Sequence, residues 1–219
     1  MFERNFMEIK TFYFNPIREC CHLAWDASRE CVIVDPGCYG ENETGRLTGF
    51  VRDSGLTPVK ILLTHCHFDH ILGLSAVAAA FPDAEVCVNP LEDGQLKRTI
   101  EWCAGLGLKY TPYSGPMHWL HDGDTVAFGR TSLEVIATPG HTEGGVCFYC
   151  KEDALLFSGD TLFAGSIGRT DHPGGDYDQL INSITTRLMT LDGEVKVLPG
   201  HGYPTSVGYE RATNPFIIQ

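Results

Sequence analysis

Four side chains that can bind a metal ion lie within six residues of this sequence: His65, His67, Asp69 and His70. They follow an apolar run, 59–64, that predicts a buried strand. On an extended chain His65 and His67 project to the same side, whereas Asp69 and His70 fall in the loop and the first turn of the next helix. Three imidazoles and a carboxylate suit a borderline cation such as zinc, and one such cluster can hold part of two metal shells.

Three further candidate ligands share one context, because each lies just past an apolar strand in a loop flanked by glycine. They are His141 after 131–137, Asp160 after 154–158 and His201 after 195–198. Glycine lets the backbone turn sharply, and loops at strand ends commonly carry chemistry. We therefore expect these side chains to complete the metal shells that the first cluster begins. The histidines without this context are interpreted as structural or surface residues: His22, His118, His121 and His172.

Two groups of strands must position these loops. In the first half of the chain, β-branched and aromatic residues predict strands at 8–14, 20–26, 31–35, 59–64 and 85–88, with helices at 43–54 and 71–81. The second half repeats this plan, with strands at 125–128, 131–137, 145–150, 154–158 and 195–198 and a helix at 177–190 that Asp176 caps. This order predicts an α+β protein in which two sheets pack together with helices outside.

The composition is typical of a globular protein with one domain. The chain has 219 residues, of which 43% are hydrophobic and 20% are charged, and this is enough for a core of useful size. Its formal net charge of -12 argues against nucleic acid and against an anionic membrane surface as partners. No apolar run is long enough to span a bilayer, so no membrane partner is expected. The sequence leaves the oligomeric state open.

The nine cysteines favour a reducing compartment. The first eight residues lack the apolar run of a signal peptide, which predicts a cytoplasmic protein whose cysteines are mostly small buried apolar residues. Cys147 and Cys150 lie in one apolar strand and project to opposite faces, so this pair is interpreted as plain strand residues. Cys66, between two candidate ligands, is expected to point away from the metals and to pack in the core.

The order of these motifs resembles the metallo-β-lactamase superfamily. His-x-His-x-Asp-His at 65–70, Gly-His at 140–141, Asp160 after a strand and Gly-His at 200–201 follow the order of that superfamily across nearly the whole chain. Within it, longer runs resemble glyoxalase II, or hydroxyacylglutathione hydrolase. These runs are VDPG at 34–37, TPGHT at 138–142, SGDTLF at 158–163, GSIGRTD at 165–171, PGGD at 173–176 and LPGHG at 198–202.

The resemblance implies a four-layer αββα sandwich with two divalent cations at one edge. By position, the first cation would be held by His65, His67 and His141, the second by Asp69, His70 and His201, and both by Asp160. Zinc is the expected metal, and iron or manganese accept the same ligands. Glyoxalase II enzymes carry a C-terminal helical region that helps to hold glutathione. This chain ends soon after its last candidate ligand and is expected to form a single domain over 1–219 without that region.

The expected activity is metal-dependent hydrolysis of a small-molecule thioester or ester. Two cations lower the pKa of a bridging water towards neutrality and polarise the carbonyl under attack. Asp69 is the expected catalytic residue, since it can orient this water or accept its proton. A thiolate leaves without an acid, because the pKa of a free thiol is about 8.5. Arg169 either contacts an acidic substrate or pairs with Asp171 or Asp176.

Other activities share this fold and its ligands. A sulfur dioxygenase, which uses one iron held by two histidines and a carboxylate, is the main alternative, and oxygen uptake with a persulfide would distinguish it. A lactonase remains open because lactones and thioesters undergo the same attack. Zinc β-lactamases of the common type carry cysteine at the position of Asp160, and a nuclease does not suit the acidic charge. A non-enzymatic metal-binding module would need a lost ligand, whereas all seven candidates are present.

Overall fold

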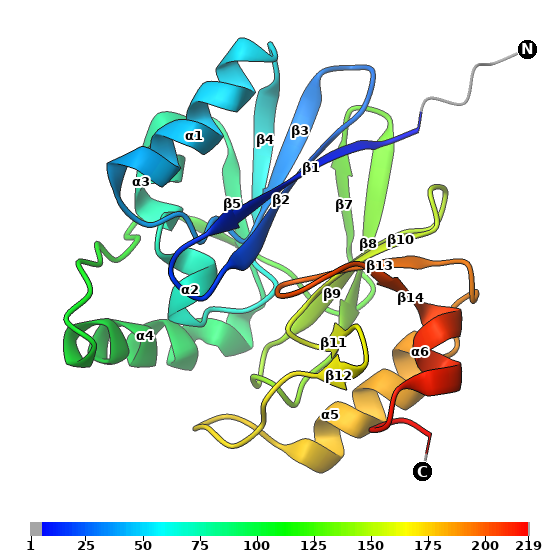
Figure 1. The fold of residues 1–219 in the computed structure, drawn as a ribbon. Coiled ribbons are helices and arrows are strands. Elements are labelled where there is room, and N and C mark those ends of the chain that lie inside the picture. The colour runs from blue at the N-terminus through cyan, green and yellow to red at the C-terminus, as the bar shows by residue number, and fades with distance from the viewer. Residues whose placement is uncertain (1–5, 219) are drawn as a thin grey trace, which may run out of the picture.

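The computed structural model describes residues 6–218, and its centre is a pair of six-stranded sheets (Figure 1). The first sheet runs in chain order: β1 (Glu8–Phe14), β2 (Glu19–Trp25), β3 (Glu30–Val34), β4 (Thr57–Leu62), β5 (Glu85–Val88) and β6 (Met117–Trp119). Its first three strands form an antiparallel meander, and β3 to β6 are parallel. Parallel neighbours need long crossovers, and the helices of this half supply them.

The second sheet is built from the second half of the chain. Its spatial order is β14 (Thr205–Ser206), β13 (Lys196–Pro199), β10 (Leu155–Gly159), β9 (Val146–Cys150), β8 (Thr131–Ala137) and β7 (Thr125–Phe128). Only β10 and β13 pair in parallel among the described strands of this sheet. A separate small hairpin, β11 (Leu162–Phe163) and β12 (Ser166–Ile167), follows β10. The ends of β8, β10 and β13 therefore lie near one another.

Helices cover the outer face of each sheet, as Figure 1 shows. With the first sheet lie α1 (Gly40–Asp53), α2 (Phe68–Ile71), α3 (Leu74–Ala80) and α4 (Asp93–Gly105), the last preceded by a short turn, η1 (Pro90–Glu92). With the second sheet lie α5 (Tyr177–Ser183), its π-helical continuation η2 (Ile184–Leu188), and α6 (Val207–Thr213). The Asp176 carboxylate accepts a hydrogen bond of 2.9 Å from the Gln179 N–H, so the predicted cap of α5 is confirmed.

Three apolar clusters establish the layer order. One joins the first sheet to its helices, the second lies between the two sheets, and the third joins the second sheet to α5 and α6. Along β9, Phe148 and Cys150 belong to the middle cluster and Cys147 to the outer one, which confirms that the two cysteines point to opposite faces. The predicted four-layer αββα sandwich is therefore confirmed.

The sequence predicts ten strands to within two residues but misses seven elements. These are η1, α4, β6, β11, β12, β14 and α6, and the split of 177–190 into α5 and η2 was not predicted either. Helix α4 lacks a continuous apolar stripe because Gly94 interrupts its first turn and Ile100 is 46% exposed. Strand β6 has only three residues, and its strand geometry comes from pairing with β5.

Residues 1–5, which carry most of the signal-peptide argument, lie outside the described residues. Among residues 6–218 no helix has the length and apolar character needed to cross a bilayer. The assignment of a single domain over 1–219 stays a prediction.

We expect the middle apolar layer to dominate stability. Phe148 is fully buried between the sheets, whereas Leu106 at the end of α4 is 62% exposed. Phe148→Ala should lower the free energy of unfolding by about 3–5 kcal/mol, and Leu106→Ala should change it by less than about 0.5 kcal/mol. Urea denaturation of the two variants measures this difference. Equal losses in both would contradict the assigned layer order.

Candidate metal centre

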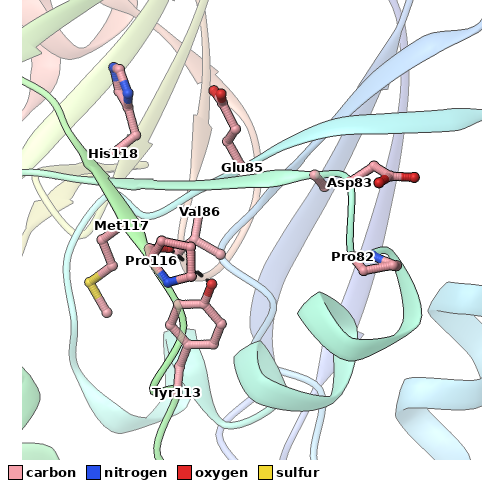
Figure 2. A pocket seen from close by; sticks show the side chains of 9 residues that line it. Pro82, Asp83, Glu85, Val86, Tyr113, Pro116, Met117 and His118 are labelled. Carbon is pink, nitrogen blue, oxygen red and sulfur yellow. Dashed lines mark hydrogen bonds between the residues drawn. The ribbon is translucent and has the colours of Figure 1, made fainter.

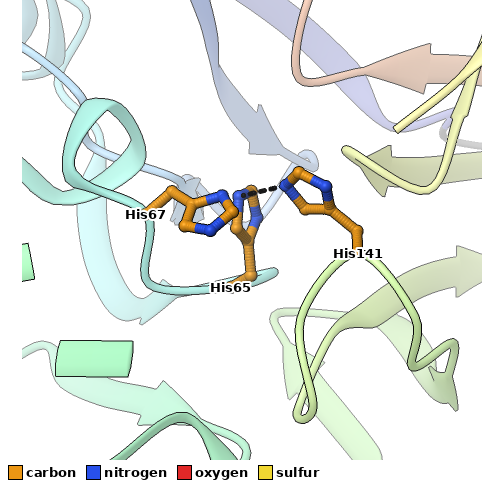
Figure 3. Close-up of side chains that lie close together, drawn as sticks. All are labelled: His65, His67 and His141. Atoms are coloured by element: carbon orange, nitrogen blue, oxygen red, sulfur yellow. Dashed lines mark hydrogen bonds between the residues drawn. The ribbon is translucent and has the colours of Figure 1, made fainter. Parts of the chain in front are cut away.

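The first of two ligand groups is formed by three histidines from two loops (Figure 3). His65 and His67 follow β4, as predicted, and His141 follows β8 in the other sheet. The Nε2 atoms of His65 and His141 lie 3.2 Å apart, and all three residues are at most 6% exposed. Three buried imidazoles at such distances match the three-histidine sets that hold zinc.

The second group contains Asp69, His70 and His201. Asp69 and His70 lie in the short helix α2, and His201 follows β13. The Asp69 Oδ2 atom is 3.0 Å from His201 Nε2 and 3.4 Å from His70 Nε2. One oxygen thus faces two imidazoles, and the three side chains could hold a second cation.

Asp160 lies between the two groups. Its Oδ1 atom is 3.3 Å from His70 Nε2, while its Oδ2 atom is 3.6 Å from His141 Nε2 and 3.7 Å from His201 Nε2. The carboxylate therefore presents its two oxygens to members of both groups. The structure brings together all seven side chains that the sequence singled out.

Unpartnered buried atoms test whether a cation fits here. His67 Nε2, His70 Nε2 and Asp160 Oδ1 are buried and have no hydrogen-bond partner among the described residues. Buried polar atoms are normally paired, so each such exception needs a cause. Lone pairs directed at a metal ion supply that cause, and the donor set of imidazoles and carboxylates fits zinc, iron or manganese.

Outer hydrogen bonds fix the imidazoles with Nε2 towards the centre. His70 donates from Nδ1 to Asp35 Oδ2 at 2.9 Å. The Thr64 hydroxyl donates to the same oxygen at 2.6 Å and accepts from His65 Nδ1 at 3.1 Å. His141 donates from Nδ1 to a backbone carbonyl at 2.7 Å. Such contacts set the tautomer and orientation of a ligating histidine.

Burial and charge in the cluster favour a bound cation. Burial and neighbouring imidazoles lower the pKa of His65 well below its usual value, and burial lowers the pKa of His67 to about 2. Both rings are therefore neutral, which is the form that binds metal. Burial also opposes charge on His70, but the carboxylates of Asp69 and Asp160 outweigh it and raise the His70 pKa well above its usual value. The carboxylates attract positive charge to this point, and a proton or a metal ion can supply it.

A buried carboxylate and a glycine hold the loops in place. Glu92 accepts hydrogen bonds from the Cys66 N–H at 2.7 Å and from the Gly144 N–H at 3.0 Å, so it joins the two loops that carry the first group. At Gly200 a Cβ atom would lie 2.3 Å from Asp160 Oδ1. Any larger residue there would push into the cluster, which explains the glycine before His201.

The cluster forms one wall of a pocket of about 450 Å³. Apolar side chains provide much of the remaining wall, namely Ile17, Phe68, Trp102 and Phe163. Trp102 stacks on the His67 ring with a centroid distance of 5.4 Å. These residues were not identified from the sequence, because an isolated aromatic residue carries no local signal of its position beside a site.

His172 corrects one sequence-based interpretation. We predicted a structural or surface role, but its ring centroid lies 4.5 Å from that of His67 and 4.9 Å from that of His141, and it lines the pocket. The prediction was wrong because the segment at 172–176 meets the loop after β8, where the Asp176 N–H bonds the Gly140 carbonyl at 2.8 Å, a non-local contact that spacing does not encode.

The other three histidines lie away from the cluster. His22 is buried and bonds Thr11 and the Pro199 carbonyl. His118 lines a separate pocket beside β5 and β6 (Figure 2), and His121 is exposed. Their interpretation as structural or surface residues is confirmed.

The sequence also predicted roles for Arg169, as a substrate contact or salt-bridge partner, and for Cys66, as a packing residue. Arg169 lines the pocket and is exposed, and its guanidinium makes hydrogen bonds of 2.9 and 3.1 Å to the Asp171 carboxylate. Of the alternatives left open for Arg169, the salt bridge to Asp171 is therefore present. Cys66 packs in the apolar cluster beneath the first sheet, which confirms its role in packing.

Several known proteins are similar to this chain in sequence and in fold. The family model of the metallo-beta-lactamase superfamily matches residues 21–201. Hydroxyacylglutathione hydrolase GloC of Haemophilus influenzae is 34% identical over 213 residues, 96% of this chain and 98% of that protein. The crystal structure of BLEG-1 B3 metallo-beta-lactamase matches with a TM-score of 0.89 at 34% identity, covering 97% and 100% of the two chains. TTHA1623 in a di-iron-bound form matches with a TM-score of 0.84 at 36% identity, covering 94% and 99%.

The chain belongs to the metallo-β-lactamase superfamily. Its αββα sandwich, and the histidines and carboxylates that meet at one edge, define it as a metal-dependent hydrolase of that superfamily.

Replacing Asp35 by asparagine should weaken metal binding, although Asp35 is not in the cluster. An amide nitrogen in place of one oxygen deprives His70 or Thr64 of its acceptor, which loosens the ring. We expect the affinity for Zn²⁺ to fall about 10–100-fold, as measured by competition with a chromogenic chelator. Circular dichroism checks that the variant is folded, and the exposed Glu85→Gln is the matched control. Equal affinities in Asp35→Asn and the parent protein would contradict this positioning role.

Proposed function

We propose that this protein hydrolyses small acyl-thioesters, as glyoxalase II enzymes do, with two divalent cations held by the seven residues of the cluster. The observation that carries the proposal is the Asp160 carboxylate, which offers one oxygen to His70 and the other to His141 and His201. In this assignment the first cation would be held by His65, His67 and His141, and the second by Asp69, His70 and His201. Asp160 would be a ligand of both.

Zinc is the metal that we propose, because histidine-rich sites with few ligands of other kinds favour it. Iron is the first alternative, since the related TTHA1623 was solved in a di-iron-bound form. Metal analysis of the purified protein distinguishes the two.

The bound cations would supply an activated water and polarise the substrate carbonyl. Asp69 is the catalytic residue in this proposal, because its carboxylate lines the pocket and lies 3.0 Å from His201 Nε2. From that position it can orient the attacking water or take its proton. Phe68, Trp102 and Phe163 restrict bulk water around the reacting carbonyl.

A thioester substrate agrees with the chemistry of the pocket. A thiolate leaves without a separate acid, because the pKa of a free thiol is about 8.5. The relative named hydroxyacylglutathione hydrolase aligns over nearly the full chain, which supports the same reaction class.

A β-lactam is the second candidate substrate class, favoured by the similarity to BLEG-1. Asp160 stands where common zinc β-lactamases carry cysteine, which favours thioesters over β-lactams. Parallel assays with nitrocefin, a lactone, and a persulfide under oxygen monitoring test the β-lactamase, lactonase and sulfur dioxygenase alternatives.

Removal of metal should abolish thioester cleavage. We expect the protein loaded with Zn²⁺ to hydrolyse S-lactoylglutathione and to lose this activity after dialysis against a chelator, with recovery on adding metal back. The release of free thiol, followed with a thiol reagent, measures turnover. Unchanged turnover after chelation would contradict the proposed role of the cations.

Asp69→Asn should lower kcat by about 10²–10⁴-fold, because the amide cannot accept a proton. Metal content, measured in the same samples, separates a loss of chemistry from a loss of metal. Asp178→Asn, an exposed change on α5, is the matched control and should keep full activity. Near-normal turnover in Asp69→Asn would rule out its catalytic role.

A further inference from the structure

A second hollow adjoins the metal pocket at the turn between β1 and β2. It has a volume of about 440 Å³ and is lined by Tyr13, Ile17, Arg18, His201, Gly202 and Tyr203. Ile17 and His201 line both this hollow and the metal pocket. A substrate whose carbonyl lies at the cluster can therefore extend past His201 into the second hollow.

Two arginines line this continuous space, and they differ in whether a carboxylate is paired with the guanidinium. Arg169 on the metal pocket is paired with the Asp171 carboxylate through two hydrogen bonds. The Arg18 guanidinium instead lies over the Tyr13 ring, 5.3 Å from its centroid, and no carboxylate of residues 6–218 forms an ion pair with it. The chain has a formal net charge of -12. The guanidinium of Arg18 lies beside the site and therefore provides positive charge at a point of an otherwise acidic protein.

The backbone of this turn is strained and firmly held. Asn15 and Arg18 have φ values of +52° and +60°, which residues with a Cβ rarely adopt. The Arg18 N–H bonds the Asn15 carbonyl at 3.2 Å. The Asn15 carboxamide donates to the carbonyls of Gly37 at 3.0 Å and Asp69 at 2.9 Å. The turn is thus attached directly to Asp69, which holds the backbone of Arg18 beside the cluster.

We propose that Arg18 forms a subsite for an anionic group, a carboxylate or a phosphate, on the thiol part of the substrate. The geometry that carries this inference is an unpaired guanidinium, stacked on Tyr13, on a rigid turn that opens into the metal pocket through Ile17 and His201. A guanidinium binds either anion with two parallel hydrogen bonds. The inference rests on the proposed thioesterase function and extends it from the reacting carbonyl to the leaving thiol.

The test measures, by calorimetry, how tightly the metal-loaded protein binds thioethers, which it cannot cleave. The parent protein is compared with the variant Arg18→Gly. Glycine tolerates a positive φ, so this variant removes the charge without straining the turn. The probes are S-methylglutathione for carboxylates, S-methyl-4′-phosphopantetheine for phosphate, and neutral S-methyl-N-acetylcysteamine. We expect Arg18→Gly to weaken binding of at least one anionic probe about tenfold and to leave the neutral probe unchanged. The anionic probe that loses affinity identifies the anion.

Two further variants complete the experiment. Arg18→Lys keeps the charge but loses the two parallel hydrogen bonds, so it should restore only part of the affinity that Arg18→Gly loses. Arg29→Gly removes an exposed arginine with a φ of +71° from the turn between β2 and β3, and it should have no effect. The corresponding kinetic result for a cleavable thioester is a KM about tenfold higher in Arg18→Gly with an unchanged kcat.

The proposal is overturned if the parent protein binds neither anionic probe more tightly than the neutral one, or if Arg18→Gly weakens all three probes equally. If binding depends on Arg18 while the metal-loaded protein cleaves no thioester, the thioesterase function fails and the anion subsite stands. The two failures are therefore distinguishable.

Discussion

The concentration of buried imidazoles and carboxylates at one edge of the sandwich is the constraint on which the structure depends. Such groups lose their hydration when they are buried, and this is costly unless charges are neutralised and lone pairs are used. In this protein the outer hydrogen bonds of Asp35 and Thr64 satisfy one nitrogen of His70 and of His65, and the opposite nitrogens remain directed at the centre. Cations bound at the cluster would neutralise the carboxylate charges and accept the remaining lone pairs.

This constraint explains several features that seem unrelated in the sequence. The loops on β4 and β8 belong to different sheets, and Glu92 joins them through two backbone N–H groups. Gly200 leaves room for the Asp160 carboxylate. The Asn15 side chain attaches the first β-turn to the carbonyl of Asp69. Each feature serves to keep loops that are distant in sequence at a fixed separation around the cluster.

The pocket combines polar and apolar walls. The candidate ligands form one wall, while Phe68, Trp102 and Phe163 form apolar walls. Of the two arginines on this space, Arg169 is paired with the Asp171 carboxylate, and Arg18 has no carboxylate partner among the described residues. In the proposed function, reaction and recognition would therefore use separate regions: the cations would act on the carbonyl, and Arg18 would bind the group attached to it.

The sequence by itself determined ten of the strands, the packing of two sheets with helices outside and the seven candidate ligands. Strand periodicity, the spacing of His65 to His70 and the glycine-flanked loops after strands are local properties. The tertiary structure alone decided which residues surround them. His172 lies beside the cluster because the segment at 172–176 bonds the loop after β8, and Trp102 lies on a helix whose pattern was too weak to predict. The pairing of Arg169 and the isolation of Arg18 likewise depend on distances between separate loops, which no short stretch of sequence specifies.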